Sequence, residues 1–319
     1  MIGSTIQLLE GVVIMLVLIT FTTVLKKTGI VDRNSSTIFG NLVLKVTLPA
    51  LIFTSLAVHK FSPDLLLSAG IVSIVEISCI FLAWILAKII KLDRGETGAL
   101  MLVSAFGMSA MLGYPIIEQV FPNNSQAIAD AVITSELGVG LVLFILGPII
   151  AIHYGGTKVD NEKRIILSSI KKFLLSPIFV AIILGIIVSY IPIPSENQVV
   201  ITLRHLLKHV SNANMFLVAL TVGLIIEFDK KNNQYIFFAA VIIIKLILQP
   251  ILSQFLGFAF DISTLQKEII LIETAMPSAI LVAIFANQYQ CKPQLVSKAI
   301  IITLIISLVS VTSIYSFFY

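Results

Sequence analysis

Apolar stretches long enough to cross a lipid bilayer recur along the whole chain, and this feature constrains the fold more than any other. A bilayer core about 30 Å thick is crossed by about 20 residues of α-helix. Only 12% of the 319 residues are charged, whereas soluble domains carry roughly 25%. We therefore predict an all-α integral membrane protein. Its ten transmembrane helices are expected at 6–25, 37–58, 65–90, 96–121, 126–152, 166–190, 204–226, 234–259, 267–289 and 294–317.

Basic residues between the apolar stretches predict the orientation of the chain. Lys and Arg in short loops are biased to the cytoplasmic side of a membrane. Fifteen of them follow odd-numbered spans, and four follow even-numbered spans. We therefore expect a multi-pass protein of the cell membrane with both termini on the extracytoplasmic side. Its partners then include the lipid bilayer. The formal charge of +4 reflects this topology and gives no reason to expect nucleic acid as a partner.

The longest polar connector, 153–164, lies at the midpoint of the chain and has five predicted spans on either side. This arrangement indicates two related halves, 1–160 and 161–319. Because five is odd, the second half must enter the membrane from the opposite face, which gives a 5+5 inverted repeat. Pro115 and Pro277 are 162 residues apart, and each lies in the fourth span of its half.

An isolated proline in a transmembrane helix most often marks only a kink. Two prolines at matching places of inverted halves indicate interrupted helices at a midplane binding site. The half-helices after Pro115 and Pro277 would direct positive dipole ends at that site. We therefore predict that the fourth and ninth helices are broken, that Pro115 and Pro277 lie close together, and that the ligand carries negative charge.

Several segments in the same order and spacing resemble the auxin efflux carrier family of membrane transporters. The resemblance covers nearly the whole chain. The segments are NLVLKVTLPALIFTSLA (41–57), GYPIIEQVF (113–121), LLSPIFVAIILGIIVSY (174–190), NANMFLVALTVGLII (212–226), IIIKLILQPIL (242–252) and ETAMPSAILVAIFANQY (273–289).

The resemblance implies a secondary transporter that moves a small organic anion by an elevator-type mechanism of alternating access. Spans 1, 2, 6 and 7 would form a scaffold and a homodimer, and spans 3–5 and 8–10 a mobile transport domain. The broken fourth and ninth helices would cross at their prolines. Bacterial members are associated with malate and malonate, and plant members with indole acetate. Family members often carry Asn-x-Gly ahead of the fourth-span break. Met108, Ser109 and Ala110 stand there in this chain, so a direct polar contact to the substrate is either missing or supplied by Ser109 or Tyr114.

Ionisable side chains deep within spans are costly unless they are paired or hydrated, so they are candidate functional residues. Glu273 lies one helical turn before Pro277 and resembles a glutamate at the ninth-helix crossover of sodium-coupled bile acid transporters. It would bind a sodium ion or pair with Lys245; no other cofactor is expected. The predicted substrate-binding residues are Ser109, Gly113, Tyr114, Pro115, Met276, Pro277, Ser278 and Lys245. The predicted ion-coupling residues are Glu273, Thr274, Glu136 and Asn287.

Other functions remain open at this point. Within transporters, the alternatives are a sodium-coupled symporter of the bile acid type and a cation/proton antiporter. A membrane receptor that does not transport could use the same site. An enzyme is not expected, because the sequence has no His-Glu-x-x-His, no Gly-x-Ser-x-Gly and no phosphate-binding glycine loop.

Overall fold

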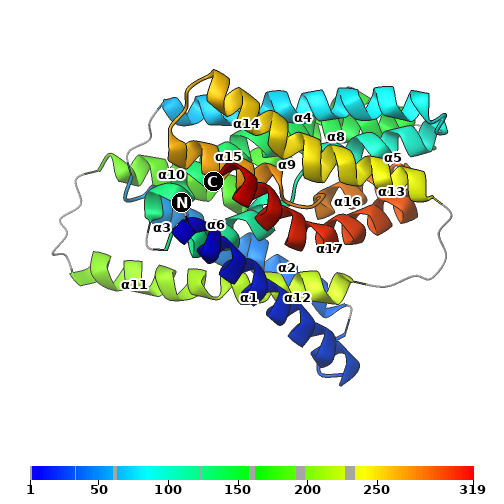
Figure 1. Ribbon diagram of the computed structural model, residues 1–319. Helices are drawn as coiled ribbons and strands as arrows, with labels where there is room; N and C mark the ends of the chain where they lie inside the picture. The colour runs from blue at the N-terminus through cyan, green and yellow to red at the C-terminus, as the bar shows by residue number, and fades with distance from the viewer. Residues whose placement is uncertain are drawn as a thin grey trace. The chain divides into compact units, whose positions relative to one another are not determined.

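The computed structural model (Figure 1) describes residues 2–32, 34–59, 63–122, 124–157, 162–191, 198–226 and 234–319. Within these ranges every regular element is a helix. The described residues also contain one isolated β-bridge, which lies between helices and joins Gly107 to Ser278. The all-α class predicted from the apolar stretches is confirmed. The chain forms two compact units, which are described separately.

Unit 1 comprises Met1–Pro63, Ala110–Val132 and Leu174–Glu227. In this unit α3 packs against α10 and α11, and α1 packs against α6 and α12. Its helices are α1 (Ile2–Lys27), α2 (Ser35–Leu42), η1 (Val43–Thr47), α3 (Leu48–Leu56), most of η2 (Ser109–Gly113), α6 (Tyr114–Val120), α7 (Ser125–Ile133), α10 (Pro177–Ser189), α11 (Gln198–Asn212) and α12 (Asn214–Ile225).

Unit 2 comprises Asp64–Ser109, Ile133–Phe173 and Phe228–Tyr319. In this unit α4 packs against α5, η3 and α14, and α17 packs against α5 and α16 (Figure 1). Its helices are α4 (Asp64–Ile89), α5 (Arg94–Ala105), η3 (Thr134–Gly140), α8 (Leu141–Tyr154), α9 (Glu162–Leu174), α13 (Tyr235–Ile242), η4 (Ile243–Leu248), α14 (Gln249–Ala259), α15 (Thr264–Thr274), α16 (Ile280–Gln288) and α17 (Pro293–Phe318).

Six helical runs among the described residues are long and apolar enough to cross a membrane. A seventh is formed by α9 and α10 if this pair, bent by 49°, is one span. These runs fit a multi-pass membrane protein. Helices occupy all ten predicted segments, but several are interrupted. The count of ten spans and the inverted repeat therefore stay predictions.

Three π-helical segments run directly up to a proline. The segments η1, η2 and η4 end one residue before Leu48–Pro49, Tyr114–Pro115 and Gln249–Pro250. Proline lacks an N–H donor, and its ring clashes with the carbonyl four residues earlier. A π-helical turn inserts an extra residue into the hydrogen-bond ladder. The wider turn thus accommodates each proline without interrupting the helix.

The prediction that Pro115 marks the break in the fourth span is wrong for this reason. Helix α5 ends at Ala105, Phe106 has extended backbone, and helical structure resumes at Ser109 and continues through Pro115. The break therefore lies at 106–108. In the ninth span the break lies between Thr274 and Ile280 and contains Pro277, as the sequence predicts.

The units differ from the predicted domains in two segments. Unit 1 contains the predicted scaffold spans 1, 2 and 7 and span 6 from Leu174 onward, but it also contains Ala110–Val132, which the resemblance assigns to the transport domain. The first part of span 6, up to Phe173, belongs to unit 2. The division into repeats near residue 160 and the movement of one domain stay predictions.

Candidate functional site

The interrupted fourth and ninth spans meet in unit 2, where their breaks pair as two short antiparallel segments. The amide of Met108 donates to the carbonyl of Pro277 at 2.7 Å, and the amide of Ala279 donates to the carbonyl of Phe106 at 2.9 Å. Unpaired backbone groups are expensive inside a membrane. Each break therefore satisfies part of the hydrogen-bonding capacity that the other break leaves open.

Side chains satisfy further backbone groups at this crossing. The hydroxyl of Ser278 donates to the carbonyl of Val103 at 2.6 Å, and its amide donates to the hydroxyl of Thr303 at 3.2 Å. The amide group of Gln249 donates to the carbonyl of Ala105 at 2.8 Å. These carbonyl and amide groups, which the sequence suggests as ligands for a substrate, are thus engaged within the protein.

Lys245 lies beneath the crossing and is fully buried. Its ammonium donates to the side-chain oxygen of Gln249 and, at 3.2 Å, to the carbonyl of Thr274. A Cβ on Gly107 would lie 2.9 Å from this ammonium, so a larger residue at the break would require the ammonium or the backbone to shift. Within the described residues, Lys245 forms no ion pair with Glu273 within 4 Å. The expected alternative of a direct Lys245–Glu273 salt bridge is therefore not seen.

Three carboxylates are buried in the same unit: Glu76, Glu136 and Glu273 are 0%, 6% and 1% exposed. Both carboxyl oxygens of Glu76 and of Glu273 lack a hydrogen-bond partner among the described residues. Glu76 and Glu136 lie close enough to act electrostatically on Glu273, and Lys245 acts on Glu76. Buried charges are stable only when they are compensated. Glu76 and Glu273, with the Lys245 ammonium acting on Glu76, therefore require a further proton or cation.

Several predicted residues make contacts within the protein. The hydroxyl oxygens of Ser109 and Ser135 lie 2.7 Å apart, and those of Thr274 and Ser253 lie 2.9 Å apart. Asn287 is exposed in the last turn of α16. It therefore lies beyond the break, and no described contact links it to Glu273.

The remaining predicted residues divide between the two units. Met276 is buried in the ninth-span break, beside Pro277. Gly113, Tyr114 and Pro115 are buried at the junction of η2 and α6 and belong to unit 1. The crossing in unit 2 thus brings together Lys245, Glu273, Thr274, Met276, Pro277 and Ser278.

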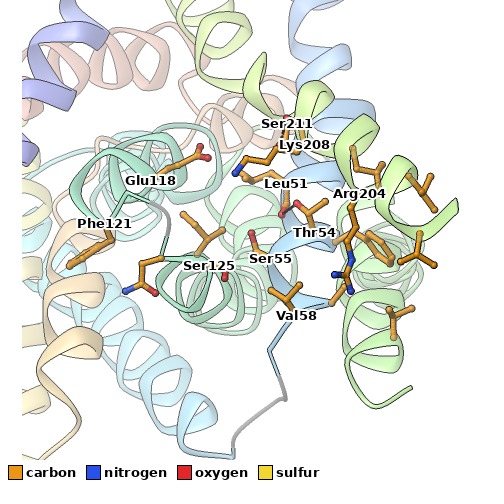
Figure 2. Close-up of a pocket in the computed structure, with 18 residues that line it drawn as sticks. Leu51, Thr54, Ser55, Val58, Glu118, Phe121, Ser125, Arg204, Lys208 and Ser211 are labelled. Carbon is orange, nitrogen blue, oxygen red and sulfur yellow. Dashed lines mark hydrogen bonds between the residues drawn. The ribbon is translucent and has the colours of Figure 1, made fainter. Parts of the chain in front are cut away.

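Unit 1 contains a cavity of about 500 Å³ that none of the predicted site residues lines (Figure 2). This volume is within the range of small-molecule sites, about 300–1,000 Å³. The walls come from 51–58, from 118–128, from Val188 and from 200–211, and most of the lining is apolar. The uncharged polar side chains of the lining are Thr54, Ser55, Asn124, Ser125 and Ser211.

Two basic residues and one acidic residue line this cavity. Arg204 and Lys208 lie four residues apart on α11 and therefore on one face of the helix. Figure 2 shows the Lys208 side chain extending toward Glu118. No carboxylate in the described part of the chain lies within 4 Å of either cation. The cavity therefore has an excess of positive charge.

A histidine adjoins the cavity wall. The Nε2 atom of His59 lies 2.6 Å from the hydroxyl of Ser125, the first residue of α7. Partial burial lowers the pKa of His59 below its ordinary value. The imidazole is therefore neutral near pH 7 and gains a positive charge in acid.

No sequence pattern described above marks Glu118, Arg204 or Lys208 as functional. Charged residues near the ends of predicted spans are ordinary, so each one alone is a weak signal. The spacing of Arg204 and Lys208 on one face of an amphipathic helix is the feature that could have identified them. Their function depends on α3 and on the α6–α7 connection, which complete the cavity.

Among the described residues, no three His, Cys, Asp or Glu side chains gather closely enough to hold a metal ion. A sodium ion at Glu273 would therefore depend on one carboxylate together with neutral oxygens, which are suitable ligands for a hard cation.

Comparison with known proteins gives a family. Residues 7–315 match the family described as "Membrane transport protein". The chain is 27% identical over 306 residues to an uncharacterized transporter of Methanocaldococcus jannaschii, covering 94% of this chain and 95% of the relative. It is 28% identical over 310 residues to an uncharacterized transporter of Methanothermobacter thermautotrophicus, covering 97% and 96%. The chain therefore belongs to the membrane transport protein family, which is the auxin efflux carrier family that its sequence segments resemble.

Proposed function

We propose that this protein is a secondary transporter of small organic anions and that the cavity of unit 1 binds the anion. The observation that carries the proposal is the pair Arg204 and Lys208, which line the cavity and have no ion-pair partner within 4 Å in the described chain. Cations that line a pocket attract anions to it. The guanidinium of Arg204 also matches a carboxylate in geometry, because it can donate two parallel hydrogen bonds.

The lining favours a carboxylate that has a carbon skeleton over a bare inorganic anion. Leu51, Phe53, Ile128 and Leu203 offer apolar contacts, and the hydroxyls of Thr54 and Ser55 offer hydrogen bonds. An apolar pocket with a few polar groups is typical of small-molecule sites. Malate, malonate and an auxin-like acid are the members of this class that the family resemblance suggests.

The proposed mechanism is an elevator-type movement of spans 3–5 and 8–10 against a dimeric scaffold of spans 1, 2, 6 and 7. Glu118, Phe121 and Ile128 of the cavity wall belong to the moving spans 4 and 5, so the movement would change the access of the anion to the cavity. In this mechanism Glu273 would hold the coupling sodium ion, which compensates part of the buried negative charge of unit 2. A cation/proton antiporter is a second candidate, favoured by one observation. Glu76 supplies a second buried carboxylate near Glu273, and neither has a described hydrogen-bond partner.

A ligand screen with purified protein tests the substrate class. The thermal stability of the protein is measured with malate, malonate and indole acetate, and with the corresponding amides as uncharged controls. A ligand at 100 times its dissociation constant stabilises the folded state by about 2.7 kcal/mol. We expect at least one acid to raise the melting temperature and its amide to have no effect.

Variants then connect binding to the cavity. Hydrogen bonds to charged groups contribute about 1.5–3 kcal/mol, so Arg204→Gln or Lys208→Gln should weaken binding by about 10- to 100-fold. Lys27→Gln is the matched control, since Lys27 is an exposed basic residue of unit 1 that does not line the cavity. Unchanged affinity in both cavity variants would exclude the cavity as the anion site.

Uptake by proteoliposomes separates the candidate functions. A transporter of anions accumulates the acid identified in the screen, and the sodium-coupled form does so in proportion to the sodium gradient. A receptor binds the acid without uptake. An antiporter moves protons in response to sodium when no organic anion is present.

A further inference from the structure

Helix α9 differs from the other helices of unit 2 in its charge and in how little of it is buried. Its sequence, EKRIILSSIKKFL, carries four basic residues and one acidic residue in 13 positions. Phe173 is its one buried residue. The ring of Phe173 packs against Phe144 with 5.0 Å between centroids and lies over Gly140. The C-terminal end of α9 is thereby fixed to unit 2, and the rest of the helix has an outer surface.

That outer surface has an apolar stripe beside a basic stripe. Leu167 and Leu174 are seven residues apart, so they lie on the same face, and they are 68% and 41% exposed. Arg164 and Lys171 each precede one of these leucines by three residues and are therefore their neighbours on the surface. Lys171 and Lys172 have no carboxylate within 4 Å in the described part of the chain. The exposed leucines favour an apolar environment, while the lysines require an anionic or aqueous one.

The lengths of α9 and α10 place these lysines near the edge of the hydrocarbon core. Helix α10 has 13 residues, all uncharged, and therefore spans about 20 Å. A bilayer core is about 30 Å thick. The residues from Lys172 to Ser176 precede α10 and add about 8 Å at the helical rise. The two lysines at the end of α9 consequently fall about where the acyl chains meet the headgroups.

We propose that α9 lies in the membrane interface and binds the anionic headgroups of phospholipids. Lys171 and Lys172 contact the headgroup phosphates, and Leu167 and Leu174 insert among the first methylene groups of the acyl chains. Amphipathic helices with basic and leucine-rich faces bind membranes in this way. The excess of basic residues on α9 makes anionic lipid the complementary occupant.

The test measures lipid preference beside α9 in the reconstituted, full-length protein. A fluorophore that responds to polarity is attached to the variant Leu167→Cys; Cys79 and Cys291 are both buried and therefore shielded from the label. Quenching by nitroxide-labelled phosphatidylglycerol is compared with quenching by nitroxide-labelled phosphatidylcholine. We expect blue-shifted emission and stronger quenching by phosphatidylglycerol, with a preference that decreases at high salt.

Charge variants then assign the preference to the two lysines. One basic residue near an anionic surface contributes about a fivefold preference, so the pair Lys171→Gln and Lys172→Gln should lower it by about 30-fold. The matched control, Lys171→Arg with Lys172→Arg, keeps the charge and should keep the preference. Equal melting temperatures of the two double variants establish that both are folded. Water-like emission from the fluorophore, or an unchanged preference in the Gln pair, would overturn the proposal.

Discussion

Replacing Gly107 by alanine should displace Lys245 from its site beneath the crossed breaks. The added Cβ would lie 2.9 Å from the ammonium nitrogen and 3.4 Å from the carbonyl oxygen of Glu273. The first distance is shorter than real Cβ contacts, so the ammonium or the backbone of the crossing must move. The ammonium cannot move freely, because it is fully buried and bonded to Gln249 and to the carbonyl of Thr274.

The size of the effect follows from these contacts. A hydrogen bond to a charged group contributes about 1.5–3 kcal/mol, and a buried charge that loses its partners costs about 3–5 kcal/mol. At roughly 2 °C per kcal/mol for a long chain, Gly107→Ala should lower the melting temperature by about 6–10 °C. The measurement is a thermal melt in detergent at a fixed scan rate, which keeps variants comparable when unfolding is irreversible.

Two further variants isolate the cause. Gly70→Ala is the matched control, because Gly70 lies inside α4 of the same unit and its added Cβ meets no atom within 4 Å. It should leave the melting temperature unchanged or raise it slightly, since alanine favours helix by about 0.5–1 kcal/mol. In a Lys245→Met background, Gly107→Ala should cost less than about 1 kcal/mol, because flexible methionine can give way. A loss that persists undiminished in that background would refute a clash with Lys245.

Two other perturbations have expected outcomes. Glu273→Gln should leave the melting temperature within about 2 °C of wild type, because the carboxylate has no described hydrogen bond to lose; uptake should lose its dependence on sodium, and a sodium dependence equal to that of wild type would contradict the coupling role. Asp93→Asn should lower the melting temperature by at most about 2 °C, since the Asp93–Lys292 pair, at 2.6 Å, is about half exposed, and asparagine remains a good N-cap for α5. Partial burial acts to raise the pKa of Asp93, but hydrogen bonds from Lys292 and from the amide of Glu96 together hold it below its ordinary value. A carboxyl with a depressed pKa contributes its full stabilisation above its unfolded pKa, about 3.9, and loses it as the pH falls through its lower folded pKa, so the difference between wild type and Asp93→Asn in a melt series should begin to shrink below about pH 4.

The helices could be predicted from the sequence because a bilayer requires long apolar segments, and such segments are evident in the residues themselves. The position of a break depends on finer balances. Proline signals a break correctly in the ninth span, where Pro277 lies between α15 and α16. In the fourth span the π-helical turn before Pro115 accommodates this proline within a continuous helix, and the break occurs at Gly107. A glycine in a membrane helix has too many other uses for this break to be inferred from it.

The two parts of the candidate site differ in how readily a sequence shows them. Lys245 and Glu273 are ionisable residues within apolar spans, so their types and positions are unusual enough to mark them. Charged residues are common at the ends of membrane spans, so Arg204, Lys208 and Glu118 do not stand out in the sequence. Their shared cavity arises only when α11 packs beside α3 and the α6–α7 connection, which are contacts between segments far apart in the sequence.

Charge is distributed in opposite ways in the two units. In unit 2, Glu76 and Glu273 are buried without a described hydrogen-bond partner, and the buried ammonium of Lys245 acts on Glu76, so this site has a deficit of positive charge. The cavity of unit 1 has two cations and one carboxylate, so it has a deficit of negative charge. The first deficit suits a proton or a metal cation, and the second suits an organic anion. The backbone groups at the breaks in the helices bind neither a cation nor an anion, because they hydrogen-bond to one another and to neighbouring side chains. We therefore propose that the crossing positions the buried carboxylates and that side chains of the unit 1 cavity hold the anion.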